Sequence, residues 1–326
     1  MIYFFIPAVS FIIVYLLTPS IRYIGLKFYA IDRPDHRKLH TKVITKLGGL
    51  GIYLGFWGGI IIIALFDLKF FRANVVLVLG TWICSTLAFL LGMYDDFQGS
   101  NAQMKFLVQV VIALLLVKVG FRVEGAFFPG LIPVIPGCCE IPLTVLWIVG
   151  ITNAINLLDG LDGLASSMVA VMSVFFAVYG FILDEPFVVF MALALLGANL
   201  GFLKFNFYPA KIFMGDAGSL FMGTVIAVLS VSPSHHQELS NPFLLPAMIL
   251  LLIPLLDTAL AIIRRTLRKQ HIFTSDSCHI HHFFIKKGLS QPQTVKRFCF
   301  LTVLLGLASL AFFCTYCQRV TCGLAP

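Results

Sequence analysis

Long apolar stretches alternate with short polar segments along the whole chain. Most of the stretches run for about 17 to 22 residues, enough for a helix to cross roughly 30 Å of hydrocarbon. Several are shorter than a full span. The pattern predicts about ten transmembrane helices, near Ile2–Ile24, Gly48–Phe66, Val75–Met93, Phe106–Lys118, Ile141–Ile155, Leu164–Leu183, Phe187–Phe205, Leu220–Val231, Phe243–Ile263 and Phe298–Cys317. We therefore expect an all-α integral membrane protein, with residues 1–326 forming a single polytopic domain.

The composition excludes a soluble protein. Of the 326 residues, 59% are hydrophobic and 12% are charged, against about 25% charged in a soluble domain. The formal net charge of +8 is explained by membrane topology and by contact with anionic lipids or phosphates. Nothing in the sequence indicates a nucleic-acid partner.

The distribution of Lys and Arg predicts the orientation in the membrane. If the N-terminus lies outside and ten helices cross, 18 of the 23 Lys and Arg residues fall in cytoplasmic segments. The positive-inside rule favours this topology over its inverse. Both termini then lie outside, and the large polar loops face the cytoplasm.

Three short runs of aspartates stand at the predicted cytoplasmic ends of apolar helices. The runs are Met93–Asp96, Asn153–Gly163 and Phe213–Ser219. A carboxylate in or near hydrocarbon costs several kcal/mol to desolvate, so repeated carboxylates at helix ends indicate a shared polar ligand. A divalent cation with phosphates is the ligand that suits them best. These runs therefore predict a membrane enzyme.

Asp95 and Asp96 end the third predicted helix and stand about 100° apart around its axis. Two adjacent carboxylates repel each other, and Mg²⁺ would relieve that repulsion, with one carboxylate as ligand and the other as base. A solvated helix end is the alternative interpretation. Asp216, in the third run, precedes a new apolar helix, where Gly218 and Ser219 would offer backbone N–H groups to phosphate oxygens. A simple N-cap is the alternative for Asp216.

The second run carries Asn153, Asn156, Asp159 and Asp162 at intervals of three residues. On a helix this spacing lines one slowly rotating stripe. Amide and carboxylate groups together suit hydrogen bonding to a nucleobase or sugar, and also metal binding. We therefore expect this stripe to bind a nucleobase, a sugar or a metal ion, with a purely structural role as the alternative.

Three histidines, His279, His281 and His282, follow Cys278 in the last predicted cytoplasmic loop. Zinc binding is one interpretation, but no Cys or carboxylate lies at a suitable spacing in the sequence. Protonated imidazoles that donate to a diphosphate or position a sugar phosphate are the second interpretation. Surface histidines without a function are the third. Among the cysteines, a disulfide involving Cys138, Cys139 or Cys322 stays open.

Together these motifs resemble the polyprenyl-phosphate N-acetylhexosamine-1-phosphate transferase superfamily. The resemblance extends over nearly the whole chain, from Asp32-Arg-Pro-Asp-His-Arg37-Lys38-Leu-His40 to Lys287-Gly288-Leu289. It implies ten or eleven membrane helices and a cytoplasmic Mg²⁺ site, with Mn²⁺ as an alternative ion. It also implies transfer of a sugar-1-phosphate from a UDP-N-acetylhexosamine to undecaprenyl phosphate, with release of UMP.

The resemblance implies a role for each candidate residue. Asp95, Asp96 and His279 match catalytic positions, with Asp95 the proposed base. Asp96 and Asp216 match carboxylates associated with Mg²⁺. The remaining matches are substrate-binding positions at Lys46, Asn156, Asp159, Asp162, His281 and His282.

Within the superfamily, the form His279-Ile-His281-His282 resembles the bacterial undecaprenyl-phosphate GlcNAc-1-phosphate transferases. Thr45 and Ser275-Asp276-Ser277 depart from the pattern of many relatives, which have proline at the first site and Pro-Asp-Arg at the second. We expect an enzyme of the bacterial cytoplasmic membrane that starts a lipid-linked cell-envelope glycan. The alternatives are a phospho-MurNAc-pentapeptide translocase and, in another class, a cation-coupled transporter of an anionic solute. The oligomeric state stays open, and a homodimer is one of its alternatives.

Overall fold

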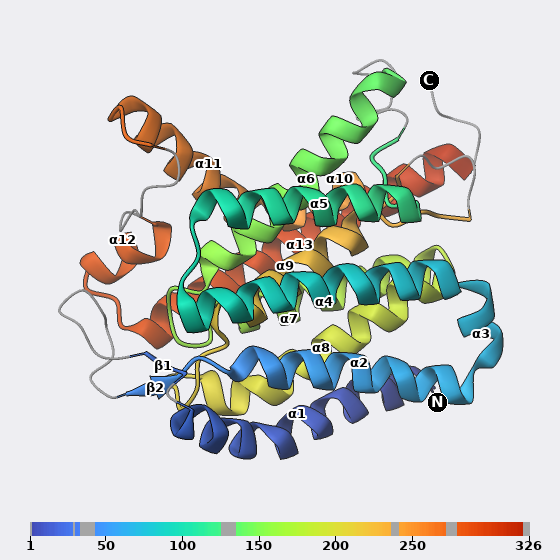
Figure 1. Ribbon diagram of the computed structural model, residues 1–326. Helices are drawn as coiled ribbons and strands as arrows, with labels where there is room; N and C mark the ends of the chain where they lie inside the picture. Colours follow the sequence, from blue (N-terminus) through green and yellow to red (C-terminus); the bar gives the residue numbers. More distant parts are fainter. Residues whose placement is uncertain are drawn as a thin grey trace.

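The computed structural model describes residues 2–28, 30–32, 43–124, 135–235, 241–271 and 279–321. Within these ranges the helices run back and forth along one direction and form a single bundle (Figure 1). Two short strands lie at one end of it. The elements are α1 (Ile2–Lys27), β1 (Ile31–Asp32), β2 (Ile44–Thr45), α2 (Gly48–Phe66), α3 (Leu68–Ala73), α4 (Val75–Gln98), α5 (Ala102–Val119), α6 (Gly137–Leu158), α7 (Leu164–Ile182), α8 (Pro186–Asn206), α9 (Gly215–Ser230), α10 (Leu244–Leu250), α11 (Leu252–Leu267), α12 (Ile280–Lys286) and α13 (Gln291–Thr321).

Every predicted apolar stretch forms helix, but the predicted number of spans is not confirmed. In the described ranges, eight helices are long and apolar enough to cross a membrane, and a ninth span results if α10 and α11 count together. These two helices meet at a bend of 72°. Pro254 explains the break, because a proline ring clashes with the carbonyl group four residues earlier, here that of Leu250. The chain is nevertheless an all-α, multi-pass membrane protein.

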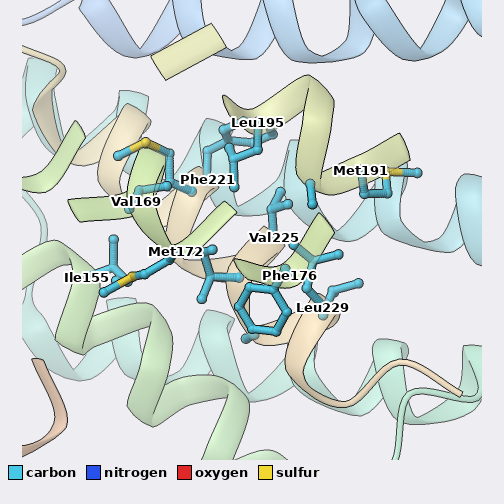
Figure 2. Packing of buried hydrophobic residues seen from close by; sticks show 14 of the residues in the cluster. Ile155, Val169, Met172, Phe176, Met191, Leu195, Phe221, Val225 and Leu229 are labelled. Carbon is cyan, nitrogen blue, oxygen red and sulfur yellow. The ribbon is translucent and has the colours of Figure 1, made fainter. Parts of the chain in front are cut away.

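Helix α9 is the shortest of the predicted spans and lies at the centre of the bundle. Its 16 residues extend about 24 Å, less than a full bilayer core. Every residue from Ala217 to Ser230 is buried, and α9 packs mainly against α4, α6 and α2. Figure 2 shows side chains of α9, including Phe221 and Val225, interleaved with those of α6, α7 and α8. A short helix is tolerated here because protein, and not lipid, surrounds it.

One end of the bundle carries β1, β2 and α12, and we call it the site end (left in Figure 1). Helix α3 and the start of α1 lie at the opposite end. The antiparallel pair of β1 and β2 matches Ile31 with Thr45. Backbone hydrogen bonds from Phe213 to Thr45 (2.9 Å) and from Gly48 to Phe213 (2.9 Å) then attach this pair to the segment before α9. As a result Lys46 is held beside the start of α9.

Some sequence motifs lie outside the described residues. The segment 33–40 of the predicted motif, Cys278, Ser275-Asp276-Ser277 and Cys322 belong to this group. Cys138 and Cys139 are described as exposed free thiols at the start of α6.

Candidate active site

Close helix crossings bring the three aspartate runs together at the site end. A Cβ atom at Gly92 of α4 would lie 2.3 Å from the carbonyl oxygen of Asp216 and 2.4 Å from Cα of Ala217. A Cβ atom at Gly49 of α2 would lie 2.3 Å from the backbone nitrogen of Gly218. Only glycine allows backbones to approach so closely, and small residues have this role at helix contacts in membranes. The N-terminus of α9 is therefore enclosed by α2 and α4.

Asp96 caps α9 from another helix. Its Oδ1 accepts a hydrogen bond from the N–H of Asp216 (3.1 Å), and its Oδ2 accepts one from the N–H of Ala217 (3.0 Å). These are N–H groups that the first turn of a helix leaves without a partner. The N-cap residue of α9 itself is Met214, and its side chain makes no capping bond. The N-cap interpretation of Asp216 is therefore wrong, and Asp96 supplies the cap.

The expected phosphate-binding N–H group of Gly218 is engaged within α9, and the hydroxyl of Ser219 bonds α6. The N–H of Gly218 donates to the carbonyl of Met214 (3.3 Å), and the residue is buried against α2. The hydroxyl of Ser219 accepts from Asn156 Nδ2 (2.8 Å) and donates to the carbonyl of Gly215 (3.1 Å). Both positions build the helix contact.

Lys105 of α5 links the first and third aspartate runs. Its Nζ donates to Asp95 Oδ2 (2.9 Å) and also forms an ion pair with Asp216 Oδ2. The other oxygen of Asp95 accepts from the N–H of Ser100 (2.7 Å) and from its hydroxyl. Asp216 Oδ1 accepts from Asn156 Nδ2 (3.0 Å). The carboxylates of Asp95 and Asp216 are therefore fixed in place by one shared cation.

The predicted stripe on α6 is split into parts with different contacts. Asn153 exchanges hydrogen bonds with Gln109 of α5, the shorter of which measures 2.6 Å, and so joins two helices away from the other site residues. Helix α6 ends at Leu158. Beyond it, Asp162 Oδ2 accepts from the N–H of Ala210 (2.9 Å). Asn156 holds Asp216, so only the last two members of the stripe reach open space.

Asp159 and Asp162 lie in the turn between α6 and α7. Gly163 has φ +74°, a left-handed conformation that glycine adopts without strain, and its N–H donates to Asn206 Oδ1 (3.1 Å). Burial, and then the nearby carboxylates of Asp216, Asp96 and Asp162, raise the pKa of Asp159 to about 8. Carboxylates crowded in this way favour a bound cation, since a cation removes both their repulsion and their desolvation cost.

A buried carboxylate from another helix holds the start of the histidine run. Asp257 of α11 accepts hydrogen bonds from His279 Nδ1 (2.9 Å, Oδ2) and from the N–H of Ile280 (2.9 Å, Oδ1). The ring of His279 stacks on that of His281, with centroids 5.7 Å apart and an interplanar angle of 7°. The ring of His282 follows at 4.3 Å from that of His281. The three imidazoles therefore form a column, which we name the histidine column.

His281 occupies the middle of the histidine column and is only 2% exposed. Burial, together with the imidazoles of His282 and His279, lowers the pKa of His281 to about 3. Without substrate this favours the neutral form of His281, and protonation of the imidazoles that donate to a bound phosphate stays a prediction. A Cβ atom at Gly160 would lie 2.5 Å from His281 Nε2, so this turn and the column are in close contact.

A cavity of about 420 Å³ opens where these elements meet. Six predicted residues line it, namely Lys46, Asp96, Asp159, Asp162, Asp216 and His282. Asp95, Asn156, His279 and His281 stand behind them and contact Lys105, Asp216 or each other. The rest of the lining comes from Asp32, Gly160, Leu161, Asn206, Phe213, Gly215 and Gln291. The three aspartate runs and the histidine run thus converge, as their sequence pattern predicted.

Several site residues were missed by sequence reasoning. Asp32 lines the cavity and pairs with Lys46 (3.5 Å), although it begins a motif that the sequence does single out. In the sequence, Lys105 is marked only as one of the Lys and Arg residues in the predicted cytoplasmic segments. Asp257 is a lone carboxylate inside the apolar stretch Phe243–Ile263, and an ionisable residue at such a position is by default a functional candidate. Asn206 and Gln291 carried no sequence signal.

The donors around the cavity suit a hard cation. Five lining residues are aspartates, and carboxylate oxygens are the ligands that Mg²⁺ prefers. Each oxygen of Asp96 accepts one backbone N–H and keeps a second lone pair. Within the described ranges, no group of three or more His, Cys, Asp or Glu side chains is arranged to hold a metal ion by itself. Mg²⁺ takes one or two carboxylates and completes its shell with water and substrate phosphates.

Comparisons with known proteins point to one family. The family described as Glycosyl transferase family 4 matches residues 78–234. The chain is 38% identical over 288 residues to a protein of Bacillus subtilis (strain 168) named probable undecaprenyl-phosphate N-acetylglucosaminyl 1-phosphate transferase, covering 88% of this chain and 78% of that one. It is 32% identical over 312 residues to a decaprenyl-phosphate N-acetylglucosaminephosphotransferase of Mycolicibacterium smegmatis (87% and 75% covered). A phospho-N-acetylmuramoyl-pentapeptide-transferase of Staphylococcus epidermidis is 30% identical over 320 residues (93% and 95% covered).

Proposed function

This chain belongs to glycosyl transferase family 4, among the polyprenyl-phosphate N-acetylhexosamine-1-phosphate transferases, and from this premise we propose its reaction. It transfers GlcNAc-1-phosphate from UDP-GlcNAc to undecaprenyl phosphate and releases UMP, starting a lipid-linked cell-envelope glycan. The observation that carries the proposal is the cavity in which five aspartates and Lys46 meet at one end of a membrane helix bundle.

The reaction exchanges one diphosphate bond for another. An oxygen of the lipid phosphate attacks the phosphorus that carries the sugar, and the bond from that phosphorus to the bridging oxygen breaks. UMP leaves with the bridging oxygen, and the lipid gains a diphosphate linked to the sugar. Phosphoryl transfer of this kind depends chiefly on positioning and on electrostatic stabilisation, which a rigid, charged cavity provides.

Both substrates are anions, whereas the cavity lining is rich in carboxylates. A cation is therefore needed between them, and Asp96 and Asp216 are the residues that would hold Mg²⁺. When bound, Mg²⁺ neutralises diphosphate charge and favours in-line attack. Lys105 and Asn156 keep Asp216 in position through its two oxygens, and Lys46 is the lining cation that attracts phosphate.

Asp159 and Asp162 are the residues proposed to bind the nucleotide, and their position in the cavity lining supports this role. Asn156, first expected in the nucleotide pocket, is better placed to support Asp216. Asp95 is the expected base, but its carboxylate is engaged by Lys105 and Ser100. A base at Asp95 would have to exchange the Lys105 contact for the substrate, and this role stays a prediction.

The proposed location is the cytoplasmic face of the bacterial inner membrane. The predicted cytoplasmic segments carry most of the Lys and Arg residues, and Lys46 and Lys105 stand at the site end. UDP-sugars are cytoplasmic substrates, so this orientation also supplies the donor. Relatives named for GlcNAc transfer support this donor over the MurNAc-pentapeptide donor.

The test is a transfer assay on the purified chain in lipid nanodiscs. Labelled UDP-GlcNAc, undecaprenyl phosphate and Mg²⁺ should give a labelled lipid and an equal amount of UMP, while EDTA should stop the reaction. Asp216→Asn should remove product formation, and Asp184→Asn, at an exposed position on the opposite end, should not change it. Product with UDP-MurNAc-pentapeptide only would favour the translocase. No product with any UDP-hexosamine, together with solute uptake into liposomes, would contradict the proposal.

A further inference from the structure

Asp257 is a buried carboxylate on a helix whose exposed face is apolar. The buried residues of α11 are Pro254, Asp257 and Ala261, which share one face because they are three and four residues apart. Leu256 and Leu260 are exposed on the same helix. The charged side chain is thus on the inner stripe, where Asp257 is 2% exposed. Burying a charge is costly unless it is paired and hydrogen-bonded, so this placement requires a specific partner.

The partner is the start of the histidine column. Asp257 holds it at two points, the ring nitrogen Nδ1 of His279 and the backbone N–H of Ile280, each at 2.9 Å. Ile280 is the first residue of α12, and no side chain of α12 or its N-cap residue satisfies that N–H. One carboxylate therefore fixes both the ring of His279 and the first turn of the helix that carries His281 and His282.

His279 itself does not reach the substrate cavity. It is 6% exposed, and the cavity lining includes His282 but neither His279 nor His281. The contact from Asp257 to the cavity runs through the column, from His279 to His281 and then to His282. The lining Gly160 also touches the column, since it leaves no room for a Cβ atom beside His281.

We propose that Asp257 and His279 are positioning residues of the transfer reaction, and that His282 is the histidine that meets the donor. This assignment rests on the proposed function and changes the role expected for His279. Asp257 orients His279 through Nδ1 and the start of α12 through the N–H of Ile280. The side-chain contacts from His279 to His281 and from His281 to His282 then carry that orientation to the cavity. A displacement of the order of 1 Å at a reacting group costs about a hundredfold in rate, so a loose column would lower the rate by about that factor although no residue lining the cavity had been replaced.

Two substitutions of His279 separate positioning from direct contact. The Nδ2 of asparagine stands close to where imidazole has Nδ1, and the Nε2 of glutamine is close to imidazole Nε2. If His279 acts through Nδ1, His279→Asn keeps the bond to Asp257 and should retain activity within about tenfold. His279→Gln and His279→Ala should then lose about a hundredfold in kcat/KM for UDP-GlcNAc. The reverse order, with His279→Gln the more active variant, would overturn the proposal.

The positioning role of Asp257 is tested with two substitutions and a double-mutant cycle. Asp257→Asn keeps an acceptor for Ile280 and a partner for the ring, so it should lose less than Asp257→Ala. In a double-mutant cycle, Asp257→Ala and His279→Ala should be strongly non-additive, because both act through one contact. The KM for undecaprenyl phosphate should not change. Additive losses, or a rise in the KM for undecaprenyl phosphate equal to that for UDP-GlcNAc, would indicate a general structural role and contradict the proposal.

A matched control lies at the opposite end of the bundle. Glu185 is also a buried carboxylate bonded to a histidine ring, at 2.8 Å from His235 Nδ1, and Glu185→Gln should leave kcat and both KM values unchanged. Thermal unfolding of each variant shows whether it folds. If the wild type makes no product, the proposed function fails, and the variants are then compared by calorimetric binding of UDP-GlcNAc with Mg²⁺. A Kd for UDP-GlcNAc that stays closer to the wild-type value in His279→Asn than in His279→Gln and His279→Ala supports the positioning role, and equal Kd values for the three variants overturn it.

Discussion

The contact between Gly92 and α9 offers a sharp test of how the site is assembled. In Gly92→Ala the new methyl group would lie 2.3 Å from the carbonyl oxygen of Asp216 and 2.4 Å from Cα of Ala217. Both neighbours are backbone atoms, so no side-chain rotation relieves the clash. Ordinary contact begins at 3.4 Å, and α4 and α9 must therefore separate by about 1 Å.

The consequence should be larger for activity than for stability. Overpacking costs about 1 to 3 kcal/mol, and the gain in helix propensity from glycine to alanine, about 1 kcal/mol, offsets part of it. The separation moves Asp216 away from Asp96, which caps α9 across this same crossing. Because a shift of about 1 Å in a reacting group costs roughly a hundredfold, we expect kcat to fall by about that factor.

Gly150→Ala is the matched control. Gly150 is also in the interior of a membrane helix, α6, and a Cβ atom there would have no neighbour within 4 Å. This variant should keep full activity and unfold at the same or a slightly higher temperature. Transfer of labelled GlcNAc-1-phosphate and thermal unfolding in nanodiscs measure both effects. If Gly92→Ala keeps more than half of the wild-type kcat, the close crossing of α4 and α9 is wrong.

The other predictions concern the cavity. Asp96→Ala and Asp216→Ala should each abolish transfer, and near-normal activity of either variant at low Mg²⁺ would refute the ligand roles. Asp96→Ala should also lower the free energy of unfolding by about 1 to 3 kcal/mol, because it leaves two N–H groups of α9 without an acceptor. Asp159→Asn should raise the KM for UDP-sugar more than that for lipid phosphate, and equal effects would indicate a structural role. Without Mg²⁺ and substrate, the pKa of Asp159 is about 8 in the folded protein, above its ordinary value of 3.8. Between these two values the folded protein binds a proton that the unfolded chain has lost, so wild-type stability should fall as the pH rises from about 4 to about 8. In Asp159→Asn, the fall in unfolding temperature over this pH range should be smaller. Elemental analysis should find no stoichiometric zinc, whereas one zinc per chain lost together with activity in His281→Ala would restore the zinc interpretation.

The membrane class and the location of the chemistry follow from local sequence properties. Apolar stretches of sufficient length have no stable alternative to helix in a bilayer, so each predicted stretch forms helix. Carboxylates at the ends of such helices are too costly to keep without a ligand, so Asp96, Asp159 and Asp216 were identified without a fold. The clustering of Lys and Arg on one side placed all these runs at the same end.

The division of roles within the site depends on contacts between distant segments, which residue spacing does not specify. Asn153 and Asn156 are equivalent in the sequence pattern, yet one bonds Gln109 and the other bonds Asp216. The break between α10 and α11 has a local cause in Pro254, whereas the contact between Asp257 and His279 joins segments 22 residues apart.

Hydrophobicity and desolvation cost act on each segment separately, so a multi-pass helical protein with acidic and histidine motifs follows from the residues alone. The packing of the helices selects which of those residues line the cavity and which hold them in place. Asp96 binds the backbone of α9, Lys105 joins two aspartate runs, and Asp257 anchors the histidine column. Each of these pairs is separated by at least ten residues along the chain, so the pairing arises when packed helices bring a buried charge to the nearest group able to satisfy it.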